Sequence, residues 1–160
     1  SNTGYFTFKL AEKGLMSIGV EHSGFMYAHS TKMKKICNFT NAAFWKIKLS
    51  PSNIISMPSV DVVLCLSVFH AWDRTYGFSK STAMLKFLIS SARKVLFFET
   101  TDPDVIYNSF NDEDPPSTDA ISNSIEIFLK DLGAIKVQNL GQTSPNLGLK
   151  TKYLFAAYTK

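Results

Sequence analysis

The sequence predicts an α/β fold whose sheet is mostly parallel and ends in an antiparallel C-terminal hairpin. Apolar strand-like runs alternate with helix-like segments over the 160 residues, and such alternation is typical of parallel sheets, which need crossover helices. Two of the apolar runs end in an acid, Glu21 and Glu99. The last two strand-like runs are joined by a Gly-, Ser-, Pro- and Asn-rich stretch with no helical character, which favours an antiparallel connection.

Hydrophobic periodicity and breaker residues define the individual elements. Helices are expected at 5–13, 24–36, 80–93 and 119–132. Strands are expected at 15–21, 43–49, 61–67, 94–99, 134–140 and 152–159. The segment 101–118 is rich in Asp, Pro, Ser and Asn and is expected to be a long loop, a type of segment that often forms a functional lid.

The composition is that of a globular domain. The chain is 45% hydrophobic and 19% charged, which excludes intrinsic disorder, and no apolar run approaches the roughly 20 residues of a membrane-spanning helix. The net charge is +4, but the lysines are scattered apart from Lys32, Lys34 and Lys35. A solvated helix face is the simpler interpretation of that cluster, so we expect no nucleic-acid partner.

Cysteine usage and chain organisation add three expectations. Cys37 and Cys65 lie far apart without histidines at metal-ligand spacing, so neither a metal site nor a disulfide framework is expected, and a reducing, cytoplasmic setting fits. With no repeat and no internal boundary, residues 1–160 are predicted to form a single domain. Because Ser1 leads almost at once into a helix-like stretch, we expect the chain to be part of a longer one. The sequence gives no indication of oligomeric state.

Candidate ligand residues follow the predicted strands, because ligands of such sheets bind at the carboxyl ends of the strands. A glycine before the first helix, Gly4, would let backbone approach a ligand at the helix N-terminus. Glu21, at the end of the next strand, has two oxygens that suit the vicinal hydroxyls of a ribose. This arrangement predicts half of a nucleotide-binding unit, with a solvated strand end as the alternative interpretation of Glu21.

Motifs spread over nearly the whole chain match one known pattern. They are the run 2–7 (NTGYFT), the run 10–14 (LAEKG), the run 19–21 (GVE), the run 61–70 (DVVLCLSVFH), the run 129–134 (LKDLGA) and the run 153–157 (YLFAA). With these motifs the chain resembles the class I S-adenosylmethionine-dependent methyltransferases. The resemblance implies a Rossmann-like methyltransferase sheet with a reversed last strand, and S-adenosylmethionine as the cofactor.

The resemblance also assigns roles to matching residues. It implies that the cofactor is contacted by Asn2, Thr3, Gly4, Glu21, His22, Ser50, Ser67 and Val68. Glu21 would hold the ribose hydroxyls, His22 would lie beside the adenine, and Ser50 stands near the position where the family often has an acid. The first strand of the family and the start of its first motif have no counterpart in this sequence. Either an upstream segment supplies them or cofactor binding has been lost.

Two residues after strands are candidate catalytic groups, His70 and Glu99. A general base helps methyl transfer only where the acceptor must lose a proton. The alternatives are a hydrogen-bonded structural histidine near Trp72 and a loop or helix-cap role for Glu99. Without a basic stripe or an Asn-Pro-Pro-Tyr-type motif, we expect a small-molecule or sugar- or glycolipid-type acceptor rather than a nucleic acid.

Two other functions stay open at this point. A non-catalytic methyltransferase-like domain of a larger protein would account for the missing first strand. A nicotinamide-dependent oxidoreductase could use Gly4 and Glu21 in the same way, but Asn2 stands where its fingerprint would want a glycine.

Overall fold

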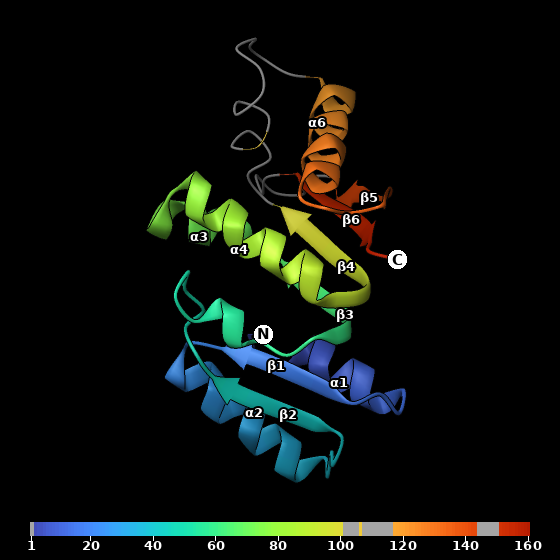
Figure 1. The fold of residues 1–160 in the computed structure, drawn as a ribbon. Helices are drawn as coiled ribbons and strands as arrows, with labels where there is room; N and C mark the ends of the chain where they lie inside the picture. Colours follow the sequence, from blue (N-terminus) through green and yellow to red (C-terminus); the bar gives the residue numbers. More distant parts are fainter. Residues whose placement is uncertain (1, 101–105, 107–116, 144–150) are drawn as a thin grey trace. The chain divides into compact units, whose positions relative to one another are not determined.

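The structure is a computed structural model that describes residues 2–100, 106, 117–143 and 151–160. These residues divide into two compact units, Ser1–Leu49 and Ser50–Lys160. Each unit has its own hydrogen-bonded sheet (Figure 1). The single domain expected from the sequence stays a prediction. The predicted loop 101–118 and the turn before the last strand lie largely outside the described residues.

The first unit is a two-stranded parallel sheet with two helices. Its elements are α1 (Tyr5–Glu12), β1 (Ser17–Glu21), α2 (Gly24–Ile36) and β2 (Ala42–Lys46). All four were predicted from the sequence, with shifts of at most a few residues at their ends. Along β1, Ser17, Gly19 and Glu21 are buried while Ile18 is exposed. Because side chains alternate across a strand, one face of β1 is covered and carries Glu21 at its end.

The second unit is a four-stranded sheet covered by helices. Its elements are η1 (Ile54–Ser56), β3 (Val60–Leu66), α3 (Phe69–Tyr76), α4 (Phe78–Ser91), β4 (Ala92–Thr100), α6 (Thr118–Asp131), β5 (Lys136–Thr143) and β6 (Lys152–Tyr158). The strand order is β3-β4-β6-β5, with β3 parallel to β4 and β6 antiparallel to both its neighbours. The predicted fold class, α/β with a mostly parallel sheet and an antiparallel hairpin strand, is confirmed.

Helix α3 (Phe69–Tyr76) was not among the elements predicted from the sequence. Phe69 and Trp72, three residues apart, are both buried, and the Phe69 ring lies 5.9 Å from Phe98 and 5.8 Å from Phe128. This burial stabilises a short helix of modest intrinsic propensity. Gly77, with φ +81° and ψ 158°, then separates α3 from α4 in a conformation essentially restricted to glycine.

The end of α4 also differs from the expectation. The predicted helix ran to Arg93, but α4 ends at Ser91 and β4 begins at Ala92, directly opposite Val60 of β3. Arg93 Nε lies 2.9 Å from Asp61 Oδ1 and Lys94 Nζ lies 3.7 Å from Asp61 Oδ2. Pairing with β3 therefore begins the strand at Ala92, and the exposed ion pairs with Asp61 add little to it.

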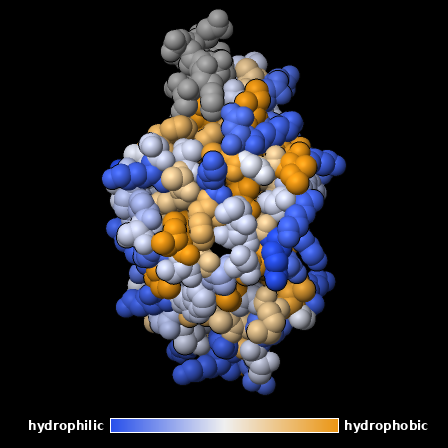
Figure 2. Space-filling model, viewed as in Figure 1, coloured by the Kyte–Doolittle hydropathy of each residue, from blue (hydrophilic) through white to orange (hydrophobic). Residues whose placement is uncertain are grey.

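Exposed apolar side chains occur in both units, for example Met16, Phe25 and Ile135. On the face drawn in Figure 2, hydrophobic and hydrophilic residues alternate at the scale of single side chains. Such scattered exposure is normal for a folded protein. None of the described helices is long and apolar enough to span a membrane.

Candidate functional site

The first group of predicted site residues surrounds the carboxylate of Glu21. The Asn2 backbone N–H donates to Glu21 Oε2 at 2.7 Å, and the Ser23 backbone N–H donates to Oε1 at 2.8 Å. Burial raises the pKa of the Glu21 carboxyl, whereas the Ser23 backbone hydrogen bond, the N-terminal ammonium and the Asn2 backbone hydrogen bond lower it, and the net pKa lies below its ordinary value. The structure therefore keeps a buried, ionised carboxylate at the carboxyl end of β1.

The backbone of Asn2 is hydrogen-bonded to both β1 and α2. Its backbone has a positive φ of 54°, and its carbonyl accepts a hydrogen bond of 3.2 Å from the Ser30 hydroxyl of α2. His22 follows Glu21, with Nδ1 3.3 Å from Glu21 Oε1 and 71% of its side chain exposed. Three of the predicted cofactor-contacting residues, Asn2, Glu21 and His22, therefore lie together. Thr3, next to Asn2 in the chain, is exposed.

Gly4 has a steric reason to be glycine. It has φ +85°, and a Cβ added there would lie 2.7 Å from the ring of Phe44. A Cβ on Gly19 would lie 2.8 Å from the same ring. The two glycines therefore make room for Phe44, a packing role that the sequence did not predict for Gly4. Gly4 also precedes α1, and no side chain caps that helix N-terminus.

The second group lies in the second unit and centres on Glu99, near the end of β4. The Ser67 hydroxyl hydrogen-bonds Glu99 Oε1, and the Ser67 backbone N–H donates to the Glu99 carbonyl at 3.0 Å. Lys152 Nζ lies 3.2 Å from Ser67 Oγ and 3.3 Å from Glu99 Oε1. We call these three residues the Ser67–Glu99–Lys152 cluster.

Lys152 was not found by sequence reasoning, which searched only the residues that follow strands. It is the first residue of β6. Because β6 runs antiparallel to β4, its beginning lies at the edge of the sheet where β3 and β4 end. The signal that could have found it is the predicted hairpin itself, since the first residue of a reversed strand shares this edge.

The remaining predicted residues lie at turns and helix starts in the second unit. Val68 is half-buried and its carbonyl accepts the backbone N–H groups of Ala71 and Trp72, so it begins α3. His70 lies in the first turn of α3 and is half-buried. Ser50 begins a turn, with its N–H bonded to Asn53 Oδ1 at 2.9 Å and its hydroxyl 3.0 Å from Ser52 Oγ. Within the described ranges, no group of three or more His, Cys, Asp or Glu residues could hold a metal ion.

No family model matches the chain, and no curated protein matches its sequence. Solved structures match it over nearly its whole length. A structure of WbdD with a kinase inhibitor covers 98% of this chain at a TM-score of 0.74 and 15% identity. WbdD is described as a bifunctional kinase-methyltransferase. The chain spans 34% of the length of that WbdD chain.

Two further matches come from structures with bound cofactor or cofactor product. Magnesium protoporphyrin IX methyltransferase (ChlM) from Synechocystis PCC 6803, with bound SAM, has a TM-score of 0.67 at 19% identity, over 99% of this chain and 66% of its own. The N-terminal domain of EvdMO1 with SAH has a TM-score of 0.67 at 13% identity, over 99% of this chain and 71% of its own. At these identities the matches show the fold alone, which this chain shares with methyltransferase structures.

Proposed function

We propose that this chain is a methyltransferase domain that binds S-adenosylmethionine and methylates a small-molecule or sugar- or glycolipid-type acceptor. The observation that carries the proposal is the Glu21 carboxylate at the carboxyl end of β1, buried and ionised. The fold shared with methyltransferases, one of them crystallised with SAM, supports it. A cytoplasmic setting is part of the same proposal.

The residues around Glu21 fit the ribose of such a cofactor. An ionised carboxylate is a strong acceptor for hydroxyl donors such as those of a ribose. Asn2, Thr3 and Gly4 precede α1 and would line the ribose and methionine side. His22, whose ring is largely exposed, would lie along the adenine.

The cofactor contacts expected at Ser50, Ser67 and Val68 stay predictions from the sequence resemblance. S-adenosylmethionine supplies an electrophilic methyl group on a sulfonium. The chain's own task is to orient the acceptor and exclude water, because in-line approach of the two reacting atoms accounts for most of the rate. Glu99 would hold an acceptor hydroxyl and take its proton, and His70 is the second candidate base.

The proposal is tested by calorimetric titration of the protein, with any native upstream segment included, against S-adenosylhomocysteine and separately NAD. We expect binding of S-adenosylhomocysteine alone. Glu21→Ala should weaken it by ~1.5–3 kcal/mol, since hydrogen bonds to a charged acceptor are lost. Glu12→Ala is the matched control, because Glu12 is an exposed acid of the first unit whose Oε2 lies 2.8 Å from Lys9 Nζ. Tight NAD binding would favour an oxidoreductase instead.

A second candidate function, a non-catalytic domain that keeps the methyltransferase fold, is favoured by a specific observation. Phe44 gives Gly4 a packing role, and the backbone N–H groups of Asn2 and Ser23 give Glu21 a structural one. Both residues would then be needed without any cofactor. Absence of S-adenosylhomocysteine binding in the same titration would support this function over the enzyme.

A further inference from the structure

A small open hollow lies beside the Ser67–Glu99–Lys152 cluster. Its volume is about 170 Å³, and it is lined by Glu99, Leu140, Gly141, Gln142, Lys152 and Leu154. These residues come from β4, β5 and β6 of the second unit. Because pockets for drug-sized ligands occupy roughly 300–1,000 Å³, the hollow has room for one small ring, or for one ring of a larger molecule.

The charged groups in its wall disfavour both ions and purely apolar ligands. The side chains of Glu99 and Lys152 are 21% and 40% exposed, and their charged atoms lie 3.3 Å apart. An anion attracted by Lys152 would be repelled by Glu99, and a cation attracted by Glu99 would be repelled by Lys152. An apolar ligand would cover both charges without replacing their hydrogen bonds to water, which costs free energy. The wall therefore favours an uncharged molecule that has its own donors and acceptors.

A hydroxyl group meets this requirement, because it donates and accepts at once. One hydroxyl can donate to the Glu99 carboxylate, and the same or a neighbouring hydroxyl can accept from the Lys152 ammonium. Leu140 and Leu154 add apolar surface of the kind that packs against the C–H face of a ring.

We propose that the hollow binds a neutral, polyhydroxylated ring, such as a sugar, with Glu99 as acceptor and Lys152 as donor. The inference rests on the proposed function and names the chemical class of its methyl acceptor. Ser67 acts as a positioning residue, because its hydroxyl and its backbone N–H both bond Glu99. Its backbone is held at a positive φ of 52° to do so, and unusual backbone of this kind concentrates at functional sites.

The proposal is tested by NMR on the full chain, labelled with ¹⁵N. Methyl β-D-glucopyranoside should produce saturable shifts of the backbone amides of Gly141, Gln142 and Lys152. Tetrahydropyran, which is the same ring without hydroxyls, and inorganic phosphate should produce none at equal concentration. The proposal is overturned if the glucoside leaves these amides unchanged, or if tetrahydropyran or phosphate saturates them equally well.

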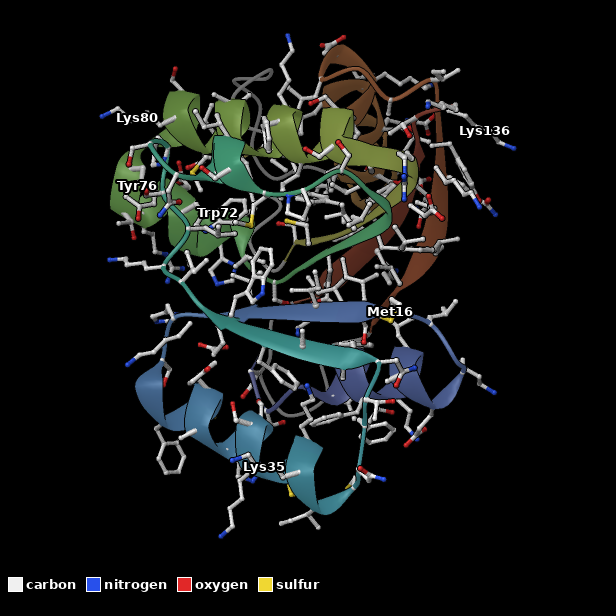
Figure 3. The ribbon with its side chains drawn as sticks, turned by 60° about the horizontal axis from the view of Figure 1, so that its bottom comes forward. Met16, Lys35, Trp72, Tyr76, Lys80 and Lys136 are labelled. Atoms are coloured by element: carbon white, nitrogen blue, oxygen red, sulfur yellow. The ribbon has the colours of Figure 1, made fainter. Side chains whose placement is uncertain are left out.

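Variants at opposite ends of one hairpin sharpen the test. Lys152→Met should weaken glucoside binding by about tenfold, the loss expected for one charge-assisted hydrogen bond. Lys136→Met is the matched control, because Lys136 extends outward at the far end of the hairpin, over the Tyr158 ring (Figure 3). Gln142→Ala is a second control and should leave binding unchanged, because Gln142 pairs with Tyr153 while Leu154 pairs with Glu99. The Gln142 side chain therefore lies on the opposite face of the sheet from Glu99 and Lys152. Unchanged affinity in Lys152→Met would overturn the assignment.

The same samples separate this inference from the proposed function. S-adenosylhomocysteine should shift the amides of Gly4 and Glu21. If S-adenosylhomocysteine binds and the glucoside does not shift the amides that line the hollow, the sugar site is wrong and the methyltransferase proposal stands. If the glucoside binds at the hollow and S-adenosylhomocysteine does not bind, the sugar site stands and the methyltransferase proposal fails.

Discussion

Two carboxylates at the ends of parallel strands are held in different ways. Glu21, after β1, accepts hydrogen bonds from the backbone N–H groups of Asn2 and Ser23. Glu99, in β4, is held by the side chains of Ser67 and Lys152. Backbone donors are fixed by the local fold and are removed only by substitution with proline, whereas side-chain donors can be changed one at a time. We therefore expect changes around Glu21 to affect stability more strongly than changes around Glu99.

The largest effect is expected at the glycine that shapes the chain beside Glu21. Gly4→Ala should lower the free energy of unfolding by about 2–4 kcal/mol. Two costs add up, because alanine is strained at this left-handed φ and its Cβ overpacks the Phe44 ring. Gly14→Ala is the control, since Gly14 has φ +80° but has nothing within 4 Å of an added Cβ. It should cost about 1–2 kcal/mol, the backbone penalty alone. Equal costs in urea denaturation would show that Phe44 gives way.

The next largest effect is expected at Glu21 itself. Glu21→Gln should lower the free energy of unfolding by about 1–3 kcal/mol at pH 7. In the wild type each carboxylate oxygen accepts a backbone N–H, whereas in the variant the amide NH₂ would face one of these N–H groups and leave it without an acceptor. The pKa of Glu21 is lower in the folded chain than in the unfolded one. Its contribution is therefore fully present above the unfolded pKa and is lost as the pH falls through the folded pKa.

Unfolding of both proteins between pH 7 and pH 3 checks this sign. The gap in stability between wild type and Glu21→Gln should close on the acid side, starting near the ordinary glutamate range, about pH 4.3. Glu12→Gln, at the exposed acid that lies 2.8 Å from Lys9, should show a small gap throughout. A Glu21 gap that widens in acid would contradict the lowered pKa.

A smaller effect is expected in the second unit. Lys152→Met should cost only about 0.5–1 kcal/mol, because the pair that it breaks is part-exposed and screened by solvent. Raising the salt concentration should shrink the difference from wild type. Lys136→Met serves again as the control. A loss as large as that of Glu21→Gln would mean that Lys152 supports the sheet itself, and the contrast between backbone-held and side-chain-held carboxylates would then fail.

The sequence was sufficient for the parts of this comparison that follow from strand periodicity. Glu21, Ser67 and Glu99 could be placed at strand ends because buried parallel strands are short apolar runs with clear limits. Lys152 could not be found by that rule, because it precedes its strand and reaches this edge only through the reversal of β6. The helix α3 was missed because its stability comes from contacts of Phe69 with Phe98 and Phe128. Those partners are distant in the chain, and no local pattern reports them.

The smallest net effect is expected for Ser67→Gly, because relief of backbone strain and loss of a hydrogen bond oppose each other there. Ser67→Ala keeps a non-glycine residue at φ +52° and loses the hydroxyl bond to Glu99, so it should cost about 1 kcal/mol. Ser67→Gly loses the same bond but relieves the left-handed backbone, so its net cost should lie within about 0.5 kcal/mol of zero. Urea denaturation of the two variants measures the difference. If Ser67→Gly proved the less stable of the two, the positive φ would carry no strain, and the hydroxyl bond alone would explain why a serine follows β3.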